Sequence, residues 1–162
     1  MPKFVINVEP FWQQELKDHT YARTVDWSAK NFDHLNKEDY NTGHLLQSFN
    51  EELPLCADAF KDVLDAHTAS VSWTCIKPNV ILPTHKDTFY TLRQEHNVEL
   101  DDCYRYLIFL EDWIFGQYVG FEHCSITKWK AGDVWCFTGH ELHYAVNASA
   151  LNFHSCQVST FN

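Results

Sequence analysis

The sequence lacks the features that mark secreted and membrane-spanning proteins. Among its 162 residues, no apolar run approaches the roughly 20 residues that are needed to cross a bilayer. The segment from Met1 to Asn7 is too short and becomes polar too quickly to serve as a signal peptide. We therefore expect a cytoplasmic protein that does not interact with membranes.

Closely spaced cysteine pairs are also missing. No two of the six cysteines have the Cys-x-x-Cys spacing of a zinc ribbon or a thioredoxin-type motif. Without a secretory signal, we expect these thiols to be reduced and mostly buried. They are Cys56, Cys75, Cys103, Cys124, Cys136 and Cys156.

Basic residues are few. The chain has 12 Lys and Arg against 22 Asp and Glu, and its formal net charge is −10. Phosphate backbones would be repelled overall, which disfavours a nucleic-acid partner. We expect a small-molecule or peptide partner instead, and the sequence does not indicate an oligomeric state. Internal repeats, low-complexity segments and linkers are absent, so the length predicts a single domain over residues 1–162.

Aromatic residues, in contrast, are abundant, with six Trp, seven Tyr and twelve Phe, and they favour β structure. From Ser70 onward, about eight short apolar segments alternate with turn residues, which is typical of an antiparallel jelly roll. Residues 68–162 are therefore predicted to form a mainly β core. The expected strands are 71–76, 80–82 (which Pro83 should end), 104–110, 118–121, 124–129, 134–137, 142–146 and 152–160.

Residues 1–67 read as a buttress for this core. A short strand over 3–8 should end at Pro10. Two helices, over 44–51 and 55–66 on either side of Pro54, are expected to pack outside a sheet. Residues 11–43 show no clear period, except for a helical turn near 33–40.

Three residues in this chain have the pattern of a metal site. His85 and Asp87 lie two positions apart after an apolar run, and in a β segment such side chains point the same way. His143 begins an apolar β segment much further on. Two imidazoles and one carboxylate suit a non-haem Fe(II) site with open coordination positions. Taken alone, the His85–Asp87 pair also fits a surface turn, and His140 competes with His143 as the distal ligand.

The order of these motifs resembles the 2-oxoglutarate-dependent Fe(II) oxygenase superfamily. His85-x-Asp87 matches its His-x-Asp element, and His143 matches its distal histidine. The run Trp129–Trp135, followed by His143–Asn147, is similar to the ending of compact bacterial and viral members. The resemblance implies a double-stranded β-helix (a cupin-like jelly roll) with Fe(II) at these three residues. It also implies 2-oxoglutarate as cosubstrate and dioxygen-dependent hydroxylation, as in prolyl or aspartyl/asparaginyl hydroxylases.

The cosubstrate site departs from the family pattern. Many members place Arg or Lys about ten residues after the distal histidine, where this chain has Phe153. Arg105, inside the most apolar strand, is the candidate to replace that cation, because a buried charge needs a partner. His154 and Ser155 are candidates for hydrogen bonds to the cosubstrate. Arg105 can instead pair with a protein carboxylate, for which the candidates are Glu111, Asp112 and Glu122.

Further residues are candidates for the pocket. Lys128 and Lys130 are weaker choices for the cosubstrate, and Arg93 lies in a polar insertion, residues 88–103, that can act as a lid together with 115–121. Six aromatic residues suit the pocket lining and equally suit the core: Trp73, Phe89, Tyr90, Trp113, Tyr118 and Phe121.

Two other functions fit the same residues. A cupin-like metalloenzyme that does not use 2-oxoglutarate, such as a dioxygenase or an isomerase, is favoured by Phe153. A noncatalytic jelly-roll binding protein is the third reading. Asp87 as a third ligand argues against a halogenase, which would need that position vacant.

Overall fold

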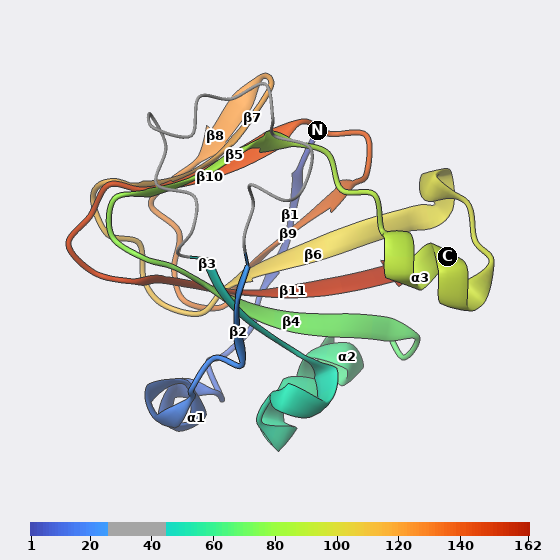
Figure 1. Ribbon diagram of the computed structural model, residues 1–162, viewed down its shortest axis with the longest axis horizontal. Helices are drawn as coiled ribbons and strands as arrows, with labels where there is room; N and C mark the ends of the chain where they lie inside the picture. Colours follow the sequence, from blue (N-terminus) through green and yellow to red (C-terminus); the bar gives the residue numbers. More distant parts are fainter. Residues whose placement is uncertain (26–44) are drawn as a thin grey trace.

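Two antiparallel sheets face each other in the computed structural model, which describes residues 1–25 and 45–162 (Figure 1). The large sheet contains β1 (Lys3–Asn7), β9 (Asp133–Thr138), β6 (Cys103–Phe109), β11 (Phe153–Phe161), β4 (Ala69–Ile76), β3 (Leu45–Phe49) and β2 (Arg23–Val25), in that order. The small sheet contains β5 (Val80–His85), β10 (His143–Asn147), β7 (Gln117–Phe121) and β8 (Cys124–Ile126). The predicted mainly β jelly roll is confirmed.

Short helices cover the outer face of the large sheet, as the sequence predicted for residues 55–66, whereas the helix over residues 13–18 was not predicted (Figure 1). They are α1 (Gln13–Asp18) and α2 (Ala59–Val63). Between them and the sheet lies an apolar layer in which Trp12, Phe60 and Trp73 are completely buried. The Trp12 indole N–H donates to the carbonyl of Leu110 at 2.9 Å, which satisfies its polar group in this layer. No helix among the described residues is long and apolar enough to cross a membrane.

The helix predicted over 44–51 is wrong. Leu45–Phe49 forms β3, and a single 3-10 turn, Asn50–Glu52, follows it. The apolar positions 45, 46 and 49 fit a helix as well as a strand, and antiparallel pairing with β2 and β4 decides between them. The second predicted helix, 55–66, is a 3-10 turn at Leu55–Asp58 that continues into α2. The turn predicted near 33–40 lies outside the described residues.

Pro83 does not end β5, which corrects another prediction. The strand continues to His85, and its pairing with β10 shifts register so that residues 82–85 lie opposite residues 143–145. Proline lacks an N–H and is tolerated in edge strands and at bulges, and Pro83 has both settings. The polar insertion after β5 contains α3 (Tyr90–His96), whose Leu92 packs with Phe89 and Cys103.

The space between the sheets is apolar at one end. Phe109 stacks on Trp129 with ring centroids 3.9 Å apart, and Trp129 stacks on Phe153 at 5.1 Å. These rings close that end of the barrel. The other end is lined by polar side chains from both sheets and holds the candidate site.

Candidate metal centre

His85, Asp87 and His143 converge at the open end of the barrel. His85 ends β5 and His143 begins β10, and the two residues are cross-strand neighbours. Asp87 follows two residues after β5, and its carboxylate lies 4.0 Å from His85 Nε2 and 3.8 Å from His143 Nε2. All three ligand atoms lie within 4.8 Å of one another. The strand pairing therefore brings together the three residues that the sequence singled out.

The two imidazoles are oriented in the same way. His85 Nδ1 donates to the carbonyl of Pro83 at 2.7 Å, and His143 Nδ1 donates to the carbonyl of Glu141 at 2.9 Å. A carbonyl can only accept, so each ring carries its proton on Nδ1 and its lone pair on Nε2. Both Nε2 atoms point toward Asp87, which is the tautomer and orientation that a metal ion requires.

Burial favours the neutral form of both rings. It lowers the pKa of His85 to about 4, with a further contribution from the neighbouring His143, and it lowers the pKa of His143 as well. Neutral imidazole is the form that coordinates metal. The side chain of Asp87 is 9% exposed, so the group combines two neutral nitrogen donors with one buried carboxylate. This donor set fits Fe(II) and neighbouring divalent metals.

His140 lies away from this cluster. It sits in the turn between β9 and β10, is exposed, and places Nε2 2.7 Å from Asp101 Oδ1. Of the two candidates for the distal ligand, His143 is the one that faces His85 and Asp87.

Arg105 contacts the cluster directly. Its Nη1 lies 2.9 Å from Asp87 Oδ2, as an ion pair without hydrogen-bond alignment. The same guanidinium donates to Gln157 Oε1 at 2.9 Å and to Ser159 Oγ at 3.2 Å. Its ion-pair partner is thus Asp87. None of the three carboxylates considered from the sequence has this role, and one of them, Asp112, pairs with Lys130.

A cavity of about 290 Å³ connects these residues. Ser155 lies in its wall, with Oγ 2.7 Å from Thr74 Oγ1. Two of the six candidate aromatic residues, Phe89 and Tyr90, also line it, whereas Trp73 belongs to the outer apolar layer and Phe121 packs against His143. Neither Arg93 nor the candidates Lys128 and Lys130 are among the lining residues.

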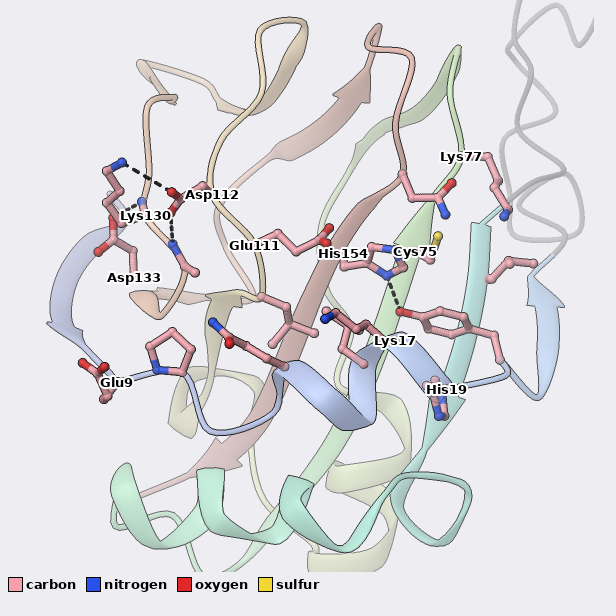
Figure 2. A pocket seen from close by; sticks show the side chains of 18 of the residues that line it. Glu9, Lys17, His19, Cys75, Lys77, Glu111, Asp112, Lys130, Asp133 and His154 are labelled. Atoms are coloured by element: carbon pink, nitrogen blue, oxygen red, sulfur yellow. Dashed lines mark hydrogen bonds and ion pairs between the residues drawn. The ribbon is translucent and has the colours of Figure 1, made fainter.

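His154 points to the opposite face of the large sheet. Adjacent residues of a strand face opposite sides, so His154 and Ser155 cannot both face the interior. His154 Nδ1 lies 2.7 Å from the Tyr21 hydroxyl, in a groove of about 1220 Å³ that it shares with Cys75 and Glu111 (Figure 2). This groove is larger than the inner cavity, but it contains none of the three clustered residues. The candidate metal ligands therefore line the smaller cavity.

Of a set of polar residues on the inner face of the large sheet, sequence reasoning found only Ser155 and missed the others. The signal was present, because Ser70, Ser72 and Thr74 alternate with apolar residues, and Ser155, Gln157 and Ser159 repeat the same period. All six line the cavity, together with Gln47.

Comparisons with known proteins agree with the fold. No protein-family model matches the sequence, and no curated protein is similar to it in sequence. A Pseudomonas putida prolyl-4-hydroxylase superposes with a TM-score of 0.56 at 11% identity, over 78% of each chain. A predicted oxalate decarboxylase from Thermotoga maritima (TM-score 0.47, 14% identity) aligns over 74% of this chain and 83% of its own. A Cupin 2 conserved barrel domain protein from Salinispora arenicola (0.45, 15%) aligns over 78% and 84%. The chain has a double-stranded β-helix, or jelly-roll, fold.

Proposed function

We propose that the protein is a non-haem Fe(II) and 2-oxoglutarate-dependent oxygenase that hydroxylates an unactivated C–H bond. The observation that carries this proposal is the combination of His85, Asp87 and His143 with a partly buried Arg105 in one cavity. The substrate is a small metabolite or a peptide side chain. Iron held there supplies a reaction in which dioxygen converts 2-oxoglutarate to succinate and CO₂, with the second oxygen atom going to the substrate as a hydroxyl group.

The protein contributes a preset ligand arrangement. The carbonyls of Pro83 and Glu141 hold the two imidazoles with Nε2 toward Asp87, so little reorganisation is needed when the metal binds. All three ligands come from one side, because β5 and β10 are neighbours and Asp87 follows β5 directly. A metal ion held by these three residues would keep coordination positions for a chelating cosubstrate and for dioxygen.

Arg105 supplies the cation for the cosubstrate. When Asp87 coordinates a metal, its charge is no longer available to Arg105 alone, and a partly buried guanidinium then favours a second anion. A carboxylate of 2-oxoglutarate suits it, because guanidinium and carboxylate form bidentate hydrogen bonds. Gln157 and Ser159 hold the guanidinium in place from β11.

Phe153 explains why the cation comes from β6 in this chain. It is buried in the aromatic stack with Phe109 and Trp129, so that position belongs to the closed end of the barrel. The cation, Arg105, sits on the neighbouring strand β6, 2.9 Å from Asp87. The name of the structurally similar prolyl-4-hydroxylase is consistent with this proposal.

The second candidate is a metalloenzyme of the same fold that does not use 2-oxoglutarate. It is favoured by the existing partners of Arg105, since Asp87, Gln157 and Ser159 already satisfy much of the guanidinium. In that case Arg105 serves only to balance the charge of the metal site.

Calorimetry with Mn(II) and 2-oxoglutarate separates the two candidates. We expect 2-oxoglutarate to bind the Mn(II)-loaded protein and not His85→Ala, and Fe(II) with dioxygen to yield succinate. His140→Ala is the matched control, because it removes an exposed histidine that is paired with Asp101. Metal binding without 2-oxoglutarate binding would favour the second candidate, and the absence of metal binding would refute both.

A further inference from the structure

The inner face of the large sheet changes character along its strands. The strand register aligns three rows across β6, β11 and β4: Arg105–Ser159–Ser70, Leu107–Gln157–Ser72 and Phe109–Ser155–Thr74. On β3, Gln47 lies beside Thr74. Polar side chains thus cover β11 and β4 across all three rows, whereas β6 becomes apolar after Arg105. We call Gln47, Ser70, Ser72, Thr74, Ser155 and Gln157 the polar wall.

The polar wall contributes less to folding stability than apolar side chains would in the same barrel interior. Ser72, Thr74 and Ser155 are 6%, 3% and 4% exposed, and the hydroxyls of Thr74 and Ser155 are 2.7 Å apart. Buried hydroxyls gain little net stability over apolar groups of similar shape. At the closed end of the same barrel the interior is filled by Phe109, Trp129 and Phe153, so the fold itself does not require polar residues there.

Charge narrows what the wall can bind. Among the described residues that line the cavity, Arg105 is the one Lys or Arg and Asp87 is the one carboxylate. Both are committed in the proposed function, Asp87 to the metal and Arg105 to the cosubstrate. The side chains of the wall are hydroxyls and amides only. A charged group placed against them would lack a counter-ion, and an apolar group would leave unused the hydrogen-bonding capacity that the wall keeps beyond the Thr74–Ser155 pair.

We propose that the polar wall binds the substrate through uncharged hydrogen-bonding groups, namely hydroxyl or carboxamide groups, on a small molecule or a single side chain. Such groups both donate and accept, as the side chains of the wall do. The cavity of about 290 Å³ lies near the lower end of ligand pockets, at roughly 300 Å³, so the enclosed part of the substrate is small. This inference rests on the proposed function and names the substrate class of that site.

Matched probes test the charge and polarity of the substrate. The probes are the N-acetyl amides of glutamine, glutamate and norleucine, together with free glutamine and erythritol. Mn(II) in the three-residue cluster relaxes the protons of any probe that binds beside it, which reports both affinity and location. We expect an uncharged polar probe to bind at least about tenfold more tightly than the glutamate and norleucine probes, a difference of about 1.4 kcal/mol. The free and capped forms of glutamine distinguish a metabolite from a peptide side chain.

Variants of the wall test its role. In Ser72→Ala/Thr74→Val, binding of the uncharged probe should weaken about tenfold, while 2-oxoglutarate binding stays unchanged. The control is Thr160→Val, which removes a buried hydroxyl of β11 that faces the other way and donates to the Thr68 carbonyl at 2.8 Å. Thr74→Val/Ser155→Ala removes both members of the hydroxyl pair, so its melting temperature should equal or exceed that of the parent protein.

Three outcomes would overturn the inference. They are tighter or equal binding of the glutamate or norleucine probe, unchanged probe binding in Ser72→Ala/Thr74→Val, and no probe binding to a protein that still binds 2-oxoglutarate. If 2-oxoglutarate itself does not bind, the proposed function fails separately. The preference of the Mn(II)-loaded protein for uncharged, charged or apolar probes still decides the inference about the wall.

Discussion

Arg105→Met is the substitution that separates the roles of Arg105 most clearly. It keeps an apolar stem of similar length but removes the guanidinium that pairs with Asp87 at 2.9 Å. The substitution should lower the stability of the metal-free protein, raise its affinity for metal and lower its affinity for 2-oxoglutarate.

The metal-free protein should lose stability. With side chains only 17% and 9% exposed, the pair attracts by about 6 kcal/mol at an effective dielectric constant of about 20, before desolvation is counted. Removing one partner of a buried pair typically costs about 3–5 kcal/mol, because the other charge is left uncompensated. Urea unfolding of the metal-free protein measures this loss. Arg93→Met is the control, since Arg93 does not line the cavity.

Metal affinity should rise in the same variant. In the parent protein, the guanidinium of Arg105 competes with the metal ion for Asp87 and also repels the metal ion. Both effects disappear with Met at this position. The affinity for 2-oxoglutarate should fall by about 2 kcal/mol or more, which is roughly thirtyfold, because its carboxylate loses a charge-assisted partner. Calorimetry with Mn(II), and then with 2-oxoglutarate, gives both values. Weaker metal binding, or unchanged binding of 2-oxoglutarate, would refute this account of Arg105.

Three further predictions concern other residues. His143→Ala should weaken Mn(II) binding by about a hundredfold or more, whereas His140→Ala should leave it unchanged; calorimetry compares the two. Burial lowers the pKa of His154 from 6.5 to about 4, so the unfolded chain binds more protons between these values and stability falls as the pH drops from 6.5 toward 4. At pH 5 this loss is up to about 2 kcal/mol, and urea unfolding of His154→Phe should show a shallower pH dependence. Phe153→Arg places a charge in the aromatic stack, so it should destabilise the protein by about 3–5 kcal/mol in thermal unfolding and should not strengthen 2-oxoglutarate binding.

Most strands after Ser70 could be predicted from the sequence, because their apolar residues alternate and turn residues separate them. The segment Leu45–Phe49 could not be assigned, since its apolar spacing fits a helix and a strand equally and only the neighbours β2 and β4 favour the strand. The orientation of His154 was predictable in principle. Its neighbour Ser155 takes the inward position, and a two-residue period allows only one of them to face the cavity.

The three candidate metal ligands could be predicted from the sequence, but the ion pair that Arg105 forms with one of them could not. His85 and Asp87 are two residues apart, and His143 opens a later strand, so the double-sheet fold brings them together. The partner of Arg105 could not be found from sequence spacing. Asp87 reaches Arg105 across the barrel from the end of the small sheet. The spacing of residues along the sequence does not indicate which side chains meet between the two sheets.

Pro83 shows how a local rule can give the wrong boundary and still mark the site. A proline after an apolar run indicates the end of a strand. Here the edge position of β5 and the register shift opposite His143–Ala145 allow the strand to continue through it. The Pro83 carbonyl accepts the proton of His85 Nδ1, which turns Nε2 toward Asp87. Pro83 is therefore part of what presents His85 as a ligand, although the proline rule places the strand end in the wrong position.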